Sequence, residues 1–467
     1  MSANGPEAVG CDAVAARERA SARGSATWAL VAICAGYFMV ILDTMVVNVA
    51  LPALSRGLHT TTTGLQWVVD AYSLVFAATL LSGGALGDRR GAKGVFMAGM
   101  GIFALSSLGC ALSPTTAVLI GARCAQGLGA ALAVPASLSL LQTTYSDQAA
   151  RRRAFGIWGG VAGIAAGAGP VVGGALVSGL GWRSVFYLNV PIGAAGLYLA
   201  ARTLPFPPPR PHGADPAGQF AGIVALAGLT TGLIEAGPLG WASPAVAGGL
   251  ATFALGATVF VAVEHRAARP MLPLELFSSF TFSAGTLVGL LINLGFYGEL
   301  FLISLYLQQL RGLSALGAGI ALLPEAAMAV VGSTLSGKVM ARLGPRPPML
   351  VGLLLGAAGL ASLVIAGTHS AYWLLVAPFM ATGLGMSLVM PAATAAVMEA
   401  APGERGGLAS GTINAARQVG GVLGVALLGT LVASRASFLP GLHAGMVMAA
   451  TAFVLGAVLT AFGVERH

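Results

Sequence analysis

GIWGGVAGIAAGAGPVVGG, residues 156–174, is apolar, uncharged and rich in glycine. In a soluble helix each glycine costs roughly 1 kcal/mol relative to alanine, but this penalty matters less in a bilayer, where an unfolded backbone has no water to bond to. Small residues recur every three or four positions, on one stripe of a helix. They are Gly156, Gly160, Gly163, Gly167, Pro170 and Gly174. Because such a stripe admits a second helix very closely, the stretch predicts a tightly packed membrane helix that Pro170 bends.

The composition also indicates a membrane protein. Of 467 residues, 56% are hydrophobic and only 9% are charged, whereas a soluble domain carries about 25% charge. The basic residues are scattered through short loops and form no run long enough for a nucleic-acid site. The cysteines show no spacing typical of a disulfide or a metal site. We therefore expect a lipid bilayer as partner, no nucleic acid and no metal.

Apolar runs of about 20 residues, each long enough to cross a bilayer, recur along the whole chain. The predicted membrane helices are residues 27–51, 62–86, 94–112, 115–140, 153–179, 184–203, 217–236, 245–263, 281–306, 314–337, 347–367, 371–395, 405–433 and 443–463. The expected fold class is an all-α polytopic membrane protein with about fourteen transmembrane helices.

A repeated loop pattern indicates internal symmetry. GALGDRRGAK (84–93) follows the second helix, and GKVMARLGPR (337–346) follows the tenth. The repeat predicts two six-helix bundles with two additional helices between them, the usual build of secondary transporters. The expected parts are a cytoplasmic tail (1–26), a first bundle (27–203), a Pro-rich linker (204–216), two linker helices (217–263), a cytoplasmic loop (264–280), a second bundle (281–463) and a tail (464–467).

The Lys and Arg residues predict the orientation. If the N-terminus is inside, most basic loop residues lie inside as well, and the outer side holds only Arg56, Arg183, Arg311 and Arg435. This bias places both termini in the cytoplasm of a multi-pass protein of the cell membrane. The first apolar run is too long for a signal-peptide core and no small-residue cleavage site closes it, so we expect it to be retained.

Several motifs together resemble a known family. GAGPVVGG (167–174) resembles the fifth-helix motif gxxxGPxxGG of exporters in the major facilitator superfamily, and GGALGDRRGAK (83–93) resembles the superfamily's signature loop. ILDTMVVNVALPAL (41–54) and LIGARCAQGLGAA (119–131) resemble the first- and fourth-helix motifs of its fourteen-helix drug–proton antiporters. The resemblance covers nearly the whole chain. It implies the major facilitator fold and a proton-coupled antiporter that exports small amphiphilic drugs or antibiotics by alternating access and confers resistance.

Charged residues within the membrane helices are the first candidates for function, because an intramembrane charge is expensive. Asp43, Asp70 and Arg123 lie at similar depth in the first half, and Glu299 lies in the second. We predict that these four residues couple transport to protons. The alternative for the two aspartates is a static pair with Arg123 that orders the bundle.

One face of the helix at 405–433 carries Asn414, Arg417 and Gln418. Because Arg417 falls near the middle of the membrane, we expect this face to border an aqueous substrate cavity. The alternative is a salt link between the bundles.

The resemblance assigns roles to two further sets of residues. The cytoplasmic gate loop would comprise Gly84, Gly87, Asp88, Arg89, Gly91 and Lys93, and the antiporter motif Gly163, Gly167, Gly169, Pro170, Gly173 and Gly174. In the gate, Asp88 would face the positive N-terminus of helix 405–433. The alternatives are simple positive-inside topology for the loop and ordinary close packing for the glycines.

Other functions stay open. The chain could export an endogenous metabolite, amino acid or lipid, or it could be a non-transporting membrane receptor, which would not need carboxylates near Arg123. HExxH, a His cluster, a suitably placed GxSxG and the phosphate loop GxxxxGK[ST] are all missing, so we expect neither an enzyme nor direct ATP drive. The expected partners are a small-molecule substrate and protons. We expect no cofactor, a proton gradient as the energy source, and a monomer.

Overall fold

The chain folds almost entirely into helices. The computed structural model describes residues 7–145, 147–205, 215–267, 270, 272, 274–401, 406–433 and 438–465. The helices are α1 (Glu7–Leu58), α2 (Thr62–Arg90), α3 (Ala92–Ala111), α4 (Thr116–Thr144), α5 (Gln148–Leu180), α6 (Ser184–Tyr187), α7 (Asn189–Thr203), α8 (Pro216–Leu239), α9 (Pro244–Arg266), η1 (Leu274–Ser278), α10 (Phe280–Leu305), η2 (Tyr306–Leu310), α11 (Ala315–Ala321), α12 (Leu323–Leu343), α13 (Arg346–Ser362), η3 (Leu363–Ile365), α14 (Trp373–Ala400), α15 (Gly406–Ala433) and α16 (Phe438–Gly463).

Within these residues, 14 segments are long and apolar enough to cross a membrane. Some of them consist of two consecutive elements, such as α6 with α7 and α11 with α12. Every predicted membrane helix has its counterpart, which confirms the fourteen-helix fold class. Most of the predicted linker at 204–216 lies outside the described residues, as do residues 1–6 and 466–467 of the predicted tails.

The ends of α1 differ from the prediction, which placed the helix at 27–51. The helix begins at Glu7 and continues through Pro52 to Leu58. Because Pro52 has no N–H, the carbonyl of Asn48 loses its helical partner. The hydroxyl of Ser304, on α10, donates a hydrogen bond to that carbonyl at 2.6 Å. The donor missing from the proline is thus supplied by a different helix.

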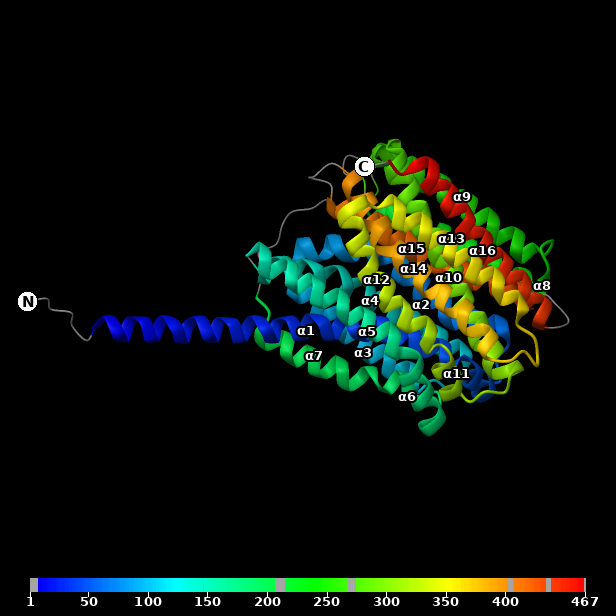
Figure 1. Ribbon diagram of the computed structural model, residues 1–467, viewed down its shortest axis with the longest axis horizontal. Helices are drawn as coiled ribbons and strands as arrows, with labels where there is room; N and C mark the ends of the chain where they lie inside the picture. Colours follow the sequence, from blue (N-terminus) through cyan, green and yellow to red (C-terminus); the bar gives the residue numbers. More distant parts are fainter. Residues whose placement is uncertain are drawn as a thin grey trace, which may run out of the picture.

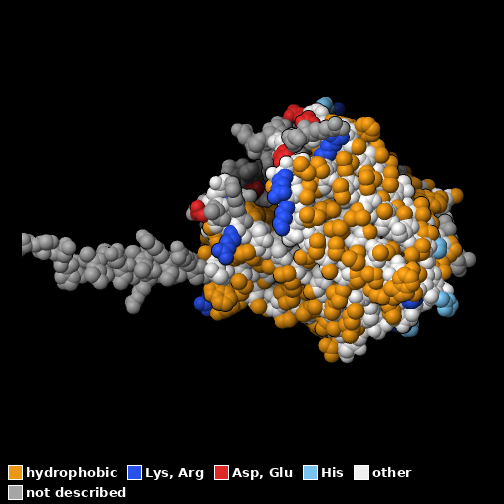
Figure 2. Space-filling model, in the orientation of Figure 1, with side chains coloured by type: hydrophobic (Ala, Val, Ile, Leu, Met, Phe, Trp, Pro, Cys, Tyr) orange, Lys and Arg blue, Asp and Glu red, His pale blue; other side chains and the backbone are white. Residues whose placement is uncertain are grey.

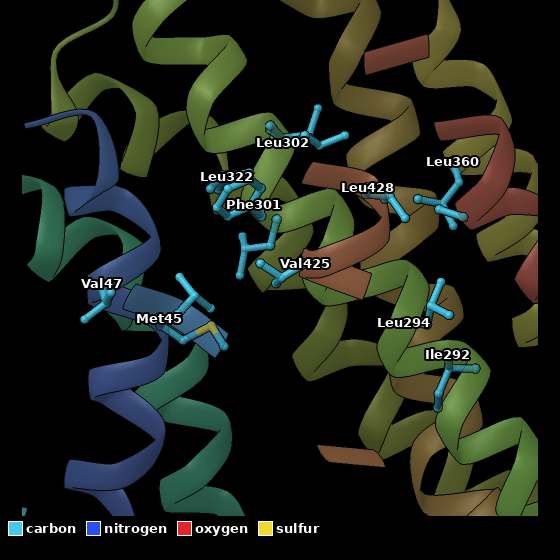
Figure 3. Packing of buried hydrophobic residues seen from close by; sticks show 14 of the residues in the cluster. Met45, Val47, Ile292, Leu294, Phe301, Leu302, Leu322, Leu360, Val425 and Leu428 are labelled. Atoms are coloured by element: carbon cyan, nitrogen blue, oxygen red, sulfur yellow. The ribbon is translucent and has the colours of Figure 1, made fainter. Parts of the chain in front are cut away.

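The spanning helices form two bundles, as predicted. We call α1–α7 the first bundle and α10–α16 the second bundle (Figure 1). One buried cluster extends across both bundles. It includes Met45 and Val47 of α1, Phe301 of α10 and Val425 of α15 (Figure 3). The two bundles therefore share a hydrophobic core over part of their length.

The two additional helices, α8 and α9, pack against each other, and α8 also lies against α2 and α15. On the α2 side, the indole of Trp67 donates to Glu235 on α8 at 3.1 Å. On the α15 side, the hydroxyl of Thr430 donates to the carbonyl of Leu233 at 2.7 Å. Because α8 bonds to a helix of each bundle, it bridges them.

The outer surface is largely apolar. Figure 2 shows hydrophobic side chains over most of the face in view, while Lys, Arg, Asp and Glu gather mainly toward its upper left. Leu105 is 72% exposed and Phe462 is 80% exposed. Large apolar side chains in that position are favourable in lipid and costly in water. The chain is a multi-pass membrane protein.

Candidate functional site

A buried ion pair lies inside the first bundle. Asp43 of α1 is 0% exposed and Arg123 of α4 is 1% exposed, and Nη1 of Arg123 lies 2.5 Å from Oδ2 of Asp43. The other carboxylate oxygen, Oδ1, accepts from the amides of Gln126 and Asn189, each at 2.8 Å. The guanidinium stacks 4.2 Å from the ring centroid of Tyr72. Both charges are therefore compensated, as a buried pair requires.

Further groups on α2 and α3 complete this network. Nε of Arg123 donates to the carbonyl of Val68 at 3.0 Å, and Nε2 of Gln126 donates to the hydroxyl of Ser107 at 2.8 Å. Neither Gln126 nor Asn189 is among the predicted site residues, although Gln126 falls in the fourth-helix motif. The signal for both was a polar side chain within an apolar run.

Asp70 does not join this network. It is 0% exposed, and among the described residues neither of its carboxylate oxygens has a hydrogen-bond partner. Gln66, one helical turn earlier, donates to the carbonyls of Val425 and Ala426 on α15. Residues four apart share a helix face, so Asp70 lies on the face of α2 that meets the second bundle. Of the three charges predicted at similar depth in the first half, two thus form a pair and the third is a separate acid.

Glu299 lies within the second bundle and does not line the cavity described below. It is 1% exposed, and Oε1 accepts weakly from the hydroxyl of Thr382 on α14, at 3.4 Å. The next residue, Gly383, packs against the backbone of Glu325, which is 6% exposed. Two buried acids, on α10 and α12, therefore flank one turn of α14.

A cavity of about 1430 Å³ lies between the bundles. Its deep wall includes Tyr37, Asn293 and Tyr297, and it extends to Asp88 at the end of α2 and Asp215 at the start of α8. We call the end of the molecule where Asp88 and Asp215 lie the α2–α3 end. Asn414, Arg417 and Gln418 all line the cavity, as does the gate-loop segment 84–89. In the described part of the chain, no three His, Cys, Asp or Glu side chains come together as metal ligands.

The gate loop turns at Gly91, which has φ 94°. That backbone conformation favours glycine. Lys93 donates to the carbonyls of Ala201 and Leu204, at 3.0 and 2.8 Å, at the end of α7. Residues 402–405, before α15, lie outside the described residues. The predicted contact of Asp88 with that helix start therefore stays a prediction.

The glycine stripe of α5 divides into two parts. A Cβ at Gly174 would lie 2.7 Å from the Cα of Leu316, and a Cβ at Gly173 would lie 2.9 Å from the Cα of Val46. A Cβ at Gly163 would meet no atom within 4 Å, and the same holds at Gly156 and Gly160. The prediction of close packing is right for the later half of α5 and wrong for the earlier half, because the bundles separate toward the α2–α3 end.

Hydrogen bonds join the bundles at the opposite end. Gln308 of η2 donates to the carbonyl of Val49 on α1 at 2.9 Å. The amide of Leu316, on α11, donates to the hydroxyl of Ser178 on α5 at 3.1 Å. With the packing of Gly174 against α11, these bonds close this end, so the cavity is open on one side only.

Comparisons with known proteins agree with this architecture. A family model described as Major Facilitator Superfamily matches residues 33–425 and 301–466. A methylenomycin A resistance protein of Streptomyces coelicolor is 36% identical over 427 residues, 91% of this chain and 90% of that protein. A tetracenomycin C resistance and export protein of Streptomyces glaucescens is 39% identical over 417 residues, 88% of this chain and 77% of that protein.

A crystal structure of the peptide transporter POT in complex with sulfate has the same fold. It superposes with a TM-score of 0.69 over 93% of each chain, at 16% sequence identity. The family model and the two resistance proteins span most of the sequence, and the solved structure matches its fold. This chain belongs to the Major Facilitator Superfamily.

Proposed function

We propose that this protein is a proton-coupled antiporter that exports small amphiphilic compounds, such as antibiotics, across the cytoplasmic membrane and so confers resistance. The observation that carries the proposal is a cavity of about 1430 Å³ between two bundles, which hydrogen bonds between the bundles close at one end. Cavities of roughly 300–1,000 Å³ already hold drug-sized ligands. The names of the relatives, resistance and export proteins for antibiotics, point to the same kind of cargo.

Alternating access accounts for the asymmetry of the two ends. Residues 27–203 and 281–463 would rock as two bodies, with α8 following both. The α2–α3 end, with both termini, would face the cytoplasm, so this conformation would accept a compound from inside. The gate loop would close that end in the other conformation, and the earlier glycines of α5 would then meet the second bundle while the later ones part from it.

Protons would act through the buried acids. Protonation of Asp43 would remove its attraction to Arg123, which then needs another partner because its charge stays buried. Such a pair has two arrangements and can therefore bias a conformational equilibrium. Asp70 and Glu299 are the other proposed proton sites, since each is buried with at least one carboxylate oxygen unbonded among the described residues. Neither a cofactor nor a second copy of the chain is needed in this scheme.

The test uses everted membrane vesicles that contain the protein and a pH-sensitive dye. A proton gradient is imposed, and a panel of antibiotics and dyes is added. Antiport predicts that at least one compound dissipates the gradient in vesicles with the protein and not in empty ones. Asp43→Asn is expected to abolish that response. If no compound acts, export of drugs by proton antiport is wrong.

A further inference from the structure

We infer that the exported compound is an organic anion, bound in the cavity by Arg417. The inference rests on the proposed export function and names the class of substrate. Intramembrane charges of both signs occur in the sequence, so the sequence alone favours neither cations nor anions. The structure distinguishes an anionic from a cationic substrate, because only some of the intramembrane charges line the cavity.

Arg417 lies deep in the cavity. It is roughly 17 Å along α15 from the first described residue of that helix, at 1.5 Å per residue. Its stem is held in place by α10, since a Cβ at Gly289 would lie 3.4 Å from the Cγ of Arg417. Tyr37 of α1 and Tyr297 of α10 line the same cavity as Arg417. The arginine is therefore positioned within the site.

The bonding capacity of Arg417 is largely unused. Nη1 donates to Oδ1 of Asn414 at a long 3.4 Å, and the buried Nε has no acceptor among the described residues. The one ion pair within the described part of the chain joins Asp43 and Arg123, so no described carboxylate neutralises Arg417. A guanidinium offers a fork of N–H donors that matches a carboxylate. An anionic ligand would supply the missing partner.

The acids cannot offer a comparable site to a cation. Asp43, Asp70 and Glu299 are buried away from the cavity wall. The acids that do line the cavity stand at helix ends near its mouth: Asp88, Asp215, Glu264 and Glu275. The charge that a bound compound meets at depth is therefore positive.

The remaining wall suits an amphiphilic molecule. Ile41, Phe76 and Leu80 supply apolar surface, and Asn293 and Gln418 supply amide groups. An apolar pocket with a few convergent polar groups is typical of small-molecule sites. The ligand class is a carboxylate, or another acid ionised near neutral pH, on an aromatic or aliphatic body.

The test uses vesicles as above with matched probes. The anions are 1-naphthoate and fluorescein, the neutral counterpart is 1-naphthamide, and the cations are rhodamine 123 and ethidium. Empty vesicles correct for passive permeation of the acids. We expect the anions alone to dissipate the proton gradient. Arg417→Gln should raise the half-maximal concentration about ten-fold or more, as loss of a charged hydrogen-bond partner does. Arg417→Lys should raise the half-maximal concentration by a smaller factor, because lysine keeps the positive charge.

Arg202→Gln is the matched control, because Arg202 is exposed at the end of α7 and does not line the cavity. A response to the cations but not to the anions would overturn the anion inference and leave antiport standing. Anion transport that is equal in wild type and Arg417→Gln would remove the assigned role of Arg417. No response to any probe would count against the export function itself.

Discussion

Asp43 and Arg123 form a buried ion pair, so removal of one charge changes the energy of the other. Both side chains are almost fully buried, and Asp43 Oδ2 lies 2.5 Å from Arg123. The side-chain amides of Gln126 and Asn189 both donate hydrogen bonds to the other carboxylate oxygen, Oδ1. A buried pair is weak evidence for stability, but its disruption is costly because one charge is left without a partner. The pair can therefore be tested through stability as well as through transport.

We predict that Asp43→Asn lowers the free energy of unfolding by about 3–5 kcal/mol, the usual cost of leaving a buried charge unpaired. The double variant Asp43→Asn/Arg123→Gln should recover much of that loss, because it removes both charges. Thermal unfolding in detergent measures the difference. Asp147→Asn is the matched control, since Asp147 caps α5 at the surface and asparagine caps equally well. Losses that simply add in the double variant would contradict the coupling.

Asp70 should behave differently, because no described group donates to its carboxylate. A carboxylate buried without donors is costly when charged, so the uncharged Asp70→Asn should unfold at the same temperature as wild type or higher. If Asp70 carries a proton during transport, the same variant should lose proton-coupled export. A strong drop in unfolding temperature would instead show that Asp70 forms a stabilising ion pair.

Single residues could be predicted from the sequence where a charge stood in an apolar run. Asp43, Arg123 and Arg417 were found in this way, and the structure places them in a network or on a cavity wall. Gln126 and Asn189 were not named, because an amide in a membrane helix is common and only its neighbours give it a role. Those neighbours lie on other helices, far away in the sequence.

The glycine stripe of α5 is packed in its later half and open in its earlier half, so substitutions in the two halves should affect stability differently. At Gly174 the backbone of α11 is so near that any side chain must displace it, whereas Gly163 has open space beside it. We predict that Gly174→Leu lowers the unfolding temperature and that Gly163→Leu does not. Gly163→Leu should still reduce transport several-fold, because closing the α2–α3 end would bring the second bundle against that leucine.

Unfolding in detergent and export from cells, measured on the same two variants, test the division of α5. Wild-type export by Gly163→Leu would mean that the earlier half of the stripe stays exposed throughout the cycle. The glycine spacing could not show this division, since the residues recur at the same intervals in both halves. Whether the second bundle packs against the stripe depends on the relative tilt of the two bundles, which a local sequence pattern cannot predict.

The proline in α1 gives a test of contact between the bundles. Ser304→Ala would leave the Asn48 carbonyl without a donor, because Pro52 cannot supply one. An unsatisfied buried acceptor costs about 1–3 kcal/mol, so we expect a loss of stability in that range. Ser362→Ala is the control, since its hydroxyl bonds within its own helix on an exposed face. Equal effects of the two alanines would contradict the assigned bond.

The arrangement of the two bundles is the part least accessible from sequence. Apolar runs and the repeated loop were enough for the number of helices and the two six-helix halves, because each span is fixed by its own composition. The end at which the halves separate depends on contacts such as Gln308 with Val49, whose partners are 259 residues apart. Two conformations of one transporter have the same sequence, so no pattern could choose between them.

A cross-link at the closed end tests both the arrangement and its movement. A Cβ at Gly167 would lie 3.8 Å from the Cβ of Ala326, on α12, and disulfides join Cβ atoms about 3.8 Å apart. In a chain whose four native cysteines are replaced by alanine, Gly167→Cys/Ala326→Cys should form a disulfide under mild oxidation. Gly163→Cys/Ala326→Cys should not, since no atom lies within 4 Å of a Cβ at Gly163.

If export requires this end to open, the oxidised Gly167→Cys/Ala326→Cys variant should fail to dissipate a proton gradient on addition of a substrate. Reduction with dithiothreitol should restore the response, because the fold is intact and only the separation of the bundles was blocked. Failure of the cross-link to form would mean that α5 and α12 do not meet here. Full transport with the cross-link complete would be the more informative failure, since it would show that substrate leaves without parting α5 from α12 and would rule out rocking about the central cavity.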